Sequence, residues 1–466
     1  MPSAAPNPIL SGCYPDPSVT RVGGDYYLVT STFEYFPGLP VFHSTDLEHW
    51  TQLGHAVDRP TQLDLSAVPS SGGLFAPTIR HHDGVFYLAC TLVGGLGRTG
   101  HFVLTATDPA GPWSDPAWLD GAEGIDPSLF FDDDGRAWLA ATRPAHHPRW
   151  HDQTEVWLRE FDPVTSTLVG DEHVLWNGAL LGAVWAEGPH LYRRDGWYYL
   201  LASEGGTEAN HAVSVARSRS VTGPYTGDPA NPVLTHRNLG PGHPVTNVGH
   251  ADLVETPDGG WAAVLLASRG PDSPLGRESF VVPVEWHDGW PVFAPGVGQV
   301  VLDEPAAPRR GMPGPLEWTG VRTAPAAVIA GDTVTLAGNA FAGVRQRHPS
   351  FAFGARVVGL ESGSDATGLA IRQSDEAHVR FVTTTAGVTA TRTEHGRTEV
   401  LATAGPATTL EIRGRDGRYE LWADDRLIAA FDGAFLGSAE AGGFVGVWLG
   451  LVADAGGGFA DVFYAG

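Results

Sequence analysis

The chain has 466 residues, more than one compact core normally holds, so we expect two or three domains. Its 60 glycines and 36 prolines indicate frequent turns between short strands, which are typical of an all-β protein. The net charge of -24 excludes nucleic acid, whose phosphates the chain would repel, and disfavours an anionic membrane surface. A neutral small ligand is compatible with this charge.

The first residues, 1–6, have neither the basic nor the apolar stretch of a secretory signal. No apolar run reaches the ~20 residues that span a bilayer. We therefore expect a cytoplasmic protein that does not bind a membrane. The two cysteines, Cys13 and Cys90, are too few for a disulfide framework or for a zinc site with two cysteine pairs. We expect two free thiols, with one bridge between them as the alternative.

Residues 1–300 contain a degenerate repeat in which a glycine turn precedes an aromatic-rich strand. Its five copies are 24–28, 84–88, 135–139, 196–200 and 259–263. The first glycines of the copies are 60, 51, 61 and 63 residues apart by subtraction. Divided over four strands, this spacing leaves roughly 13–16 residues per strand and turn, which fits one propeller blade. The repeat predicts a five-bladed β-propeller.

An equivalent position, eight or nine residues before each repeat glycine, carries mostly polar side chains. Asp16 and Ala76 lie eight residues before their glycines, and Asp126, Glu187 and His250 lie nine residues before theirs. The innermost strands of a propeller line its axis, so equivalent positions on them converge. We therefore expect these five residues to meet in one central pocket.

Glycoside hydrolysis usually requires two carboxyl groups, one on each side of the bond that is cleaved. Glu187 follows the largely apolar segment 183–186, which disfavours its charged form and suits a proton donor. Asp16 stands between two prolines, whose stiff backbone suits a base that must aim a water molecule. A third carboxylate, Asp126, would disfavour ionisation of Glu187 and help to keep it protonated.

After residue 300 the repeat ends. The proline-rich segment 301–325 predicts a linker, and alternating runs in 326–466 predict a β-sandwich. The glycine-containing segment 414–418 lies between two such runs and predicts a hairpin. Strands are expected at 333–336, 351–360, 366–373, 377–385, 409–412, 419–422 and 442–453.

The order and spacing of the motifs from residue 7 to about 295 resemble glycoside hydrolase family 43, in its two-domain β-xylosidase and α-L-arabinofuranosidase branch. The matching segments are 7–10, 14–18, 30–38, 73–77, 125–130, 187–192, 249–256 and 275–278. The resemblance implies a five-bladed propeller followed by a sandwich, an inverting mechanism and attack at the non-reducing end. In relatives a loop of the second domain closes the pocket, but the small, glycine-rich segment 453–458 is not assigned that role.

The resemblance also implies residue roles. It makes Asp16 the general base, Glu187 the general acid and Asp126 the aspartate that modulates the pKa of the acid. It places Phe33, Phe75, His250 and Arg277 against the sugar. Family members often have Trp at the position of Phe75, so a wider pocket floor or rim is expected here.

Taken without the resemblance, these residues have structural alternatives. Phe33 and Phe75 also fit core aromatics, Arg277 fits a surface partner of Glu278, and His250 fits a buried structural histidine. In some relatives the position of His250 helps to hold a metal, often calcium. No acidic cluster near His250 completes an oxygen cage, so we expect no metal ligands and no required cofactor, with calcium near His250 as the alternative.

The sequence therefore predicts an inverting exo-glycoside hydrolase. It would release terminal xylose or arabinofuranose from xylan-derived or arabinose-containing oligosaccharides. The alternative is a carbohydrate-binding propeller without catalysis, but the pairing of Asp16 with Glu187 favours the enzyme. The expected partner is a small oligosaccharide, and assembly into a homo-oligomer stays open.

Overall fold

The computed structural model describes residues 7–240, 242–270, 273–303, 310–360 and 365–466. The start of the chain and residues 304–309 of the expected linker lie outside the described residues. Strands dominate the described chain, which confirms the all-β class. The described helices are short, namely η1 (Pro315–Glu317), η2 (Ala434–Leu436) and α1 (Ser438–Ala441). None of these helices is long and apolar enough to cross a membrane.

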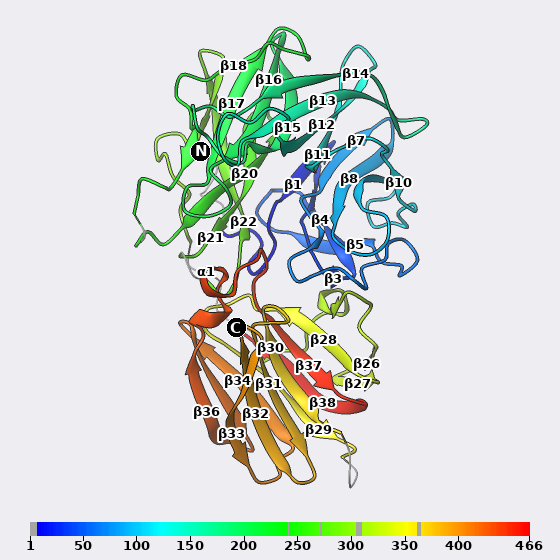
Figure 1. Ribbon diagram of the computed structural model, residues 1–466, viewed down its shortest axis with the longest axis vertical. Helices are drawn as coiled ribbons and strands as arrows, with labels where there is room; N and C mark the ends of the chain where they lie inside the picture. The colour runs from blue at the N-terminus through cyan, green and yellow to red at the C-terminus, as the bar shows by residue number, and fades with distance from the viewer. Residues whose placement is uncertain (1–6, 241, 271–272, 304–309, 361–364) are drawn as a thin grey trace.

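Five antiparallel sheets follow one another along the first part of the chain, coloured blue to green in Figure 1. The first sheet contains β1 (Ser18–Val22), β2 (Asp25–Val29), β4 (Gly38–Ser44) and β5 (Thr51–Val57). The second contains β6 (Gly73–Leu74), β7 (Thr78–His82), β8 (Val85–Val93), β9 (Gly100–Ala106) and β10 (Ala117–Trp118). The third contains β11 (Ile125–Phe131), β12 (Ala137–Pro144), β13 (Thr154–Asp162) and β14 (Thr167–Trp176).

The last two sheets repeat this pattern. The fourth sheet contains β15 (Glu187–Arg194), β16 (Trp197–Glu204), β17 (Ala212–Ser218), β18 (Thr226–Gly227) and β19 (Leu234–Thr235). The fifth contains β20 (Thr246–Glu255), β21 (Trp261–Ser268), β22 (Glu278–His287) and β23 (Trp290–Phe293). Each repeat glycine predicted from the sequence lies in the turn before the second long strand of its sheet.

The inner strands of the five sheets contact one another in a closed order. This order runs β1, β7, β11, β15, β20 and back to β1. Apolar side chains fill the spaces between adjacent sheets, and one cluster joins Leu28 of the first sheet to Val264 of the fifth. The ends of the five inner strands therefore face a shared centre.

The last part of the chain forms a sandwich of two sheets, coloured yellow to red in Figure 1. One sheet contains β24 (Arg310–Gly311), β26 (Ala327–Ala330), β27 (Thr333–Ala337), β29 (Phe351–Val358), β34 (Thr409–Arg415), β35 (Arg418–Ala423), β36 (Arg426–Asp432) and β38 (Gly456–Ala465). The other contains β28 (Ala340–Arg345), β30 (Thr367–Arg372), β31 (His378–Thr384), β32 (Gly387–Glu394), β33 (Arg397–Ala404) and β37 (Trp448–Ala453). One apolar core, with Phe353 and Phe381 fully buried, lies between the two sheets.

The predicted hairpin joins β34 to β35. Asp416 and Gly417 both have positive φ, 49° and 81°, as a tight type I′ turn requires. The predicted strand at 442–453 differs, because β37 begins only at Trp448 and residues 442–447 form no strand. The segment expected to be a linker contains β24 and also β25 (Gly320–Val321), which pairs with β3 (Tyr35–Phe36) of the first part.

The two parts of the chain share a buried contact. The indole of Trp448 stacks on the ring of Tyr35 with centroids 3.6 Å apart, and both side chains are fully buried. Next to them, Arg345 Nε donates a hydrogen bond to the carbonyl oxygen of Cys13 at 2.7 Å. These contacts anchor β37 and β28 of the sandwich against the first part of the chain.

Replacement of this indole should destabilise the protein strongly. We expect Trp448→Ala to lower the free energy of unfolding by about 3–5 kcal/mol, because a large buried side chain leaves a cavity. Equilibrium denaturant unfolding would measure it. The control is Trp422→Ala, since Trp422 lies half-buried on the sandwich. Equal losses in the two variants would contradict a special role for the Tyr35 contact.

Candidate active site

All seven side chains singled out in the sequence line one pocket. The pocket has a volume of about 70 Å³. Its lining consists of Asp16, Phe33, Phe75, Ala76, Ile125, Asp126, Glu187, Thr207, His211, His250, Arg277 and Phe444. The five positions that the repeat predicted to converge are all among them.

Irregular backbone at the pocket end of the inner strands aims these side chains. Asp16, Asp126 and His250 all have positive φ, between 47° and 57°. Glu187 precedes a glycine with φ 57°. The strand pairing of β11, β15 and β20 is interrupted near these residues. Such bulges bend a strand and re-aim its side chains, and Asp tolerates the left-handed conformation better than most residues.

Asp16 is held as an ionised carboxylate. Arg277 Nη1 donates a hydrogen bond to its Oδ1 at 3.0 Å, and the Ser31 hydroxyl donates to its Oδ2. His250 Nδ1 lies 3.8 Å from Oδ1. Burial alone would raise the pKa of Asp16, but Arg277, His250 and the Ser31 hydrogen bond outweigh it and lower that pKa below its usual value.

The other two carboxyl groups are shifted in the opposite direction. Burial and the neighbouring Asp126 and Asp16 raise the pKa of Glu187 well above its usual value. Burial also raises the pKa of Asp126 to about 6, although its Oδ2 accepts a hydrogen bond from the backbone N–H of Gly188 at 3.1 Å. The same pocket therefore favours the ionised form of Asp16 and the protonated form of Glu187.

Arg277 is a pocket residue and not a surface partner of Glu278, so that sequence alternative is wrong. Its Nη1 also donates to Thr207 Oγ1 at 2.9 Å, and its Nη2 donates to the carbonyl oxygen of Phe444 at 3.3 Å. Glu278 instead accepts two hydrogen bonds from Arg269.

Two histidines complete the polar lining. The His250 ring lies against Gly188, where a Cβ would come within 2.9 Å of it, so a glycine is required after Glu187. His211 was not predicted, because it lies outside the repeat position. Its Nδ1 donates to the carbonyl oxygen of Asn247 at 3.0 Å, and burial lowers its pKa to about 3. The neutral ring leaves Nε2 as an acceptor with no partner among the described residues.

The residues around His250 offer few free oxygen ligands to a calcium ion. Calcium takes six to eight oxygen ligands, whereas His250 offers nitrogen and its nearest carboxylate is already bound by Arg277 and Ser31. Among the described residues no group of three or more His, Cys, Asp or Glu side chains could hold a metal.

Three aromatic rings wall the pocket, and the sequence revealed only two of them. Phe33 and Phe75 pack edge to face, and Phe444 stacks on Phe33 with centroids 5.9 Å apart. Phe444 comes from the segment before β37, and its backbone N–H donates to Ser71 Oγ at 2.9 Å. The second domain thus reaches the pocket through residues 443–446 and not through 453–458.

Chemically, this arrangement offers a base and an acid to one bound molecule. An ionised carboxylate can accept a proton from water while a protonated carboxyl donates one to a leaving oxygen. The aromatic walls suit the apolar face of a sugar ring, and the guanidinium and imidazole groups suit its hydroxyls.

The comparison with protein families agrees with this chemistry. The model of the glycosyl hydrolases family 43 matches residues 5–291. The chain belongs to this family, as its motifs predicted, and the family acts on carbohydrate without a cofactor.

Curated relatives match this chain over only part of their own length. A "Xylosidase/arabinosidase" of Butyrivibrio fibrisolvens is 53% identical over 302 residues, covering 64% of this chain and 57% of that protein. A non-reducing end α-L-arabinofuranosidase of Bacteroides ovatus is 48% identical over 290 residues, covering 61% of this chain and 52% of that protein. The matches thus span little more than half of these curated relatives.

A solved structure matches the whole chain. The xylan β-1,4-xylosidase from Bacillus halodurans superposes with a TM-score of 0.89 at 30% identity. The match covers 99% of this chain and 100% of that one. Both parts of the fold, and not only the part with the pocket, are therefore shared.

Removal of the pocket cation should raise two carboxyl pKa values. We expect Arg277→Met to raise the pKa of both Asp16 and Glu187, because Arg277 lowers each of them in the native pocket. Carboxyl ¹³C chemical shifts followed through a pH titration would measure both. The control is Arg322→Met, since Arg322 joins the two domains through the carbonyl oxygen of Val68 and the carboxylate of Asp375 and does not line the pocket. An unchanged Asp16 titration in Arg277→Met would contradict the assigned ion pair.

Proposed function

We propose that this protein is an inverting exo-glycoside hydrolase that releases terminal xylose or arabinofuranose from xylan-derived or arabinose-containing oligosaccharides. One observation carries the proposal: three buried carboxyl groups share one pocket, and their pKa values are shifted in opposite directions. Such a separation assigns base and acid to different groups. Names of relatives that include both xylosidase and arabinofuranosidase support both sugars.

In this proposal the five sheets are the blades of a five-bladed propeller, formed by residues 1–300. Residues 301–325 connect it to the sandwich of residues 326–466. The closed order of the inner strands supports the propeller, because a ring of five leaves no inner strand without two neighbours.

Asp16 acts as the general base. Its carboxylate is ionised, and Arg277 and Ser31 fix both of its oxygens. A water molecule between this carboxylate and the sugar would lose its proton to Asp16 as the water oxygen attacks the anomeric carbon. Because the carboxylate is already held in one orientation, less conformational entropy is lost when the reacting groups are aligned.

Glu187 acts as the general acid and donates its proton to the oxygen of the leaving sugar. The negative charge of Asp126 raises the pKa of Glu187. Asp126 also accepts a hydrogen bond from the N–H of Gly188 and so holds the backbone directly after Glu187. Asp16 precedes β1 and Glu187 begins β15, two strands that are not neighbours in the ring. This separation suits the roughly 6.5–9.5 Å between carboxyl groups that inversion requires.

The pocket favours attack on a chain end. Three aromatic rings and Ile125 line the pocket where the inner strands of the five sheets converge, and this placement suits the single sugar at a chain end. Arg277, Thr207, His211 and His250 line it as candidate partners for hydroxyl groups. The substrate is then a small oligosaccharide, and we expect the protein to act in the cytoplasm.

A direct test distinguishes the proposed enzyme from the alternative, a sugar-binding propeller without catalysis. We expect turnover of nitrophenyl β-D-xyloside, nitrophenyl α-L-arabinofuranoside or both, with early product in the anomeric configuration opposite to the substrate. Proton NMR within the first turnovers, before mutarotation, would measure it. Sugar binding without turnover of either substrate would support the alternative. Early product of retained configuration would make Asp16 a nucleophile and reject its role as base.

The effect of removing the general acid should depend on the leaving group of the substrate. We expect Glu187→Gln to slow hydrolysis of xylobiose far more than that of nitrophenyl glycosides, since a good leaving group needs little protonation. The wild-type rate should fall as pH rises through the raised pKa of Glu187, and the variant should lose this alkaline limb. Steady-state kcat/KM against pH on both substrates would measure these effects. Equal losses on both substrates would contradict the acid role.

A further inference from the structure

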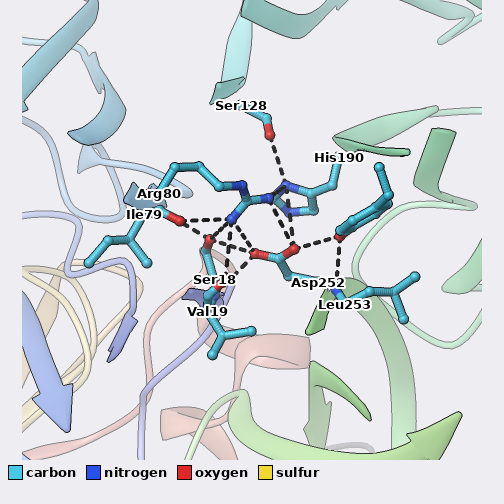
Figure 2. A network of polar contacts seen from close by, with 9 residues as sticks. Ser18, Val19, Ile79, Arg80, Ser128, His190, Asp252 and Leu253 are labelled. Atoms are coloured by element: carbon cyan, nitrogen blue, oxygen red, sulfur yellow. Dashed lines mark hydrogen bonds and ion pairs between the residues drawn. The ribbon is translucent and has the colours of Figure 1, made fainter. Parts of the chain in front are cut away.

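A buried polar layer lies beneath the pocket on the same inner strands. Ser18 follows Asp16 by two residues, Ser128 follows Asp126 by two, and Asp252 follows His250 by two. Two residues along a strand correspond to about 6–7 Å, so this layer directly underlies the pocket residues. Figure 2 shows these side chains converging from several strands.

Asp252 joins the first and last sheets of the ring. Its side chain is fully buried, and its Oδ2 accepts hydrogen bonds from the Ser18 hydroxyl at 2.7 Å and from the Val19 N–H at 3.0 Å. The Tyr192 hydroxyl donates to its Oδ1. One carboxylate thereby ties the strand after Asp16 to β20, which carries His250, and to β15 (Figure 2).

Arg80 supplies the positive charge in this layer. Its Nη1 and Nη2 lie 2.8 and 3.1 Å from the two oxygens of Asp252. Nη1 also donates to the carbonyl oxygen of Ile79 at 2.8 Å. Arg80 belongs to the second sheet, whose pocket position is Ala76 and carries no polar group. The second sheet therefore places no charged side chain in the pocket, but it provides Arg80 as the cation of the layer below.

His190 of β15 connects β11, the one inner strand not yet joined, to this layer. Its Nδ1 accepts hydrogen bonds from Arg80 Nη2 at 3.0 Å and from the Ser128 hydroxyl at 2.9 Å. Burial lowers its pKa to about 3, so the ring is neutral and suited to accept both. His190 follows Glu187 by three residues on β15. The layer therefore links all five inner strands through side-chain hydrogen bonds (Figure 2).

We propose that Arg80 and Asp252 are positioning residues for the reaction assigned above. The proposal rests on that function. The paired charges hold the five inner strands at fixed separations, and these separations set where Asp16, Glu187 and His250 stand around the sugar. Neither side chain lines the pocket, so neither is assigned a contact with the substrate.

Two physical arguments support this role. Left-handed backbone at Asp16, Asp126 and His250 persists only where the surrounding structure over-determines it. A buried ion pair contributes little net stability compared with apolar packing, but it demands one geometry, because a displaced partner leaves a buried charge unsatisfied. A hydrolase that must keep a base and an acid apart by a fixed gap requires such a constraint.

The test starts from Asp252→Asn, which keeps the shape of the side chain and leaves Arg80 without its counter-charge. We expect kcat on xylobiose to fall by about 10- to 100-fold, with a smaller change in KM, because the reacting groups are displaced. The alkaline limb of the pH profile should move to lower pH, since an unpaired cation beneath the pocket favours ionised Glu187.

The double variant Arg80→Met/Asp252→Asn separates position from charge and from stability. It removes both charges, so the alkaline limb should return towards that of the wild type and thermal stability should largely recover. The rate should stay at least about tenfold low, because the hydrogen bonds that Arg80 makes to Asp252 and His190 on the neighbouring strands are still missing. If Asp252→Asn does not fold, Ser18→Ala and Tyr192→Phe each remove one bond to Asp252 and should lower kcat with little change in KM.

Asp132→Asn is the matched control. Asp132 is also a buried carboxylate that accepts one hydrogen bond from an arginine, Arg193, and one from a tyrosine, Tyr198. It lies beyond the far end of β11, away from the pocket. We expect a lower melting temperature with unchanged kcat and pH profile. The proposal is overturned if Asp252→Asn behaves like this control, or if the double variant regains the wild-type rate. Activity of the wild type itself tests the proposed function separately.

Discussion

A single guanidinium faces three buried carboxyl groups, and its unequal effect on them sets the chemistry of the pocket. Arg277 bonds directly to Asp16, and this contact offsets the burial that would otherwise favour the neutral acid. For Glu187 the same cation is the weakest influence, and burial with two neighbouring carboxylates prevails. Arg277, together with His250 and Ser31, therefore favours the ionised form of Asp16, whereas burial and the neighbouring carboxylates favour the protonated form of Glu187.

The position of Arg277 depends in turn on the second domain. Its Nη2 donates to Phe444, and the turn before it, at Gly276, approaches Gly446 so closely that a Cβ would lie 2.8 Å from the Gly446 nitrogen. Burial raises the pKa of Glu34, next to the pocket wall, to about 7, with Arg372 of the sandwich 3.7 Å away. The sandwich thus supplies part of the pocket's wall and a contact that holds its cation, Arg277.

Much of the fold could be predicted because the signals are local. A glycine turn before an aromatic strand, repeated five times, reflects backbone sterics and half-buried pleated surface, which neighbouring residues decide. The hairpin at Asp416 and Gly417 is local in the same sense. Residues 442–447 were predicted as the start of a strand, yet contacts with the first domain hold them as a loop. Such long-range contacts leave no periodic trace in the sequence.

The sequence alone determined which residue types occupy the five equivalent positions, and hence Asp16, Asp126, Glu187 and His250, because a repeat carries position in its spacing. Only the tertiary structure decided that His211, Thr207 and Phe444 join them, since these come from loops and from another domain. Only the tertiary structure could also pair Arg80 with Asp252, 172 residues apart. Spacing predicts what a repeat brings together, whereas contacts between unlike segments depend on distances that only the folded chain defines.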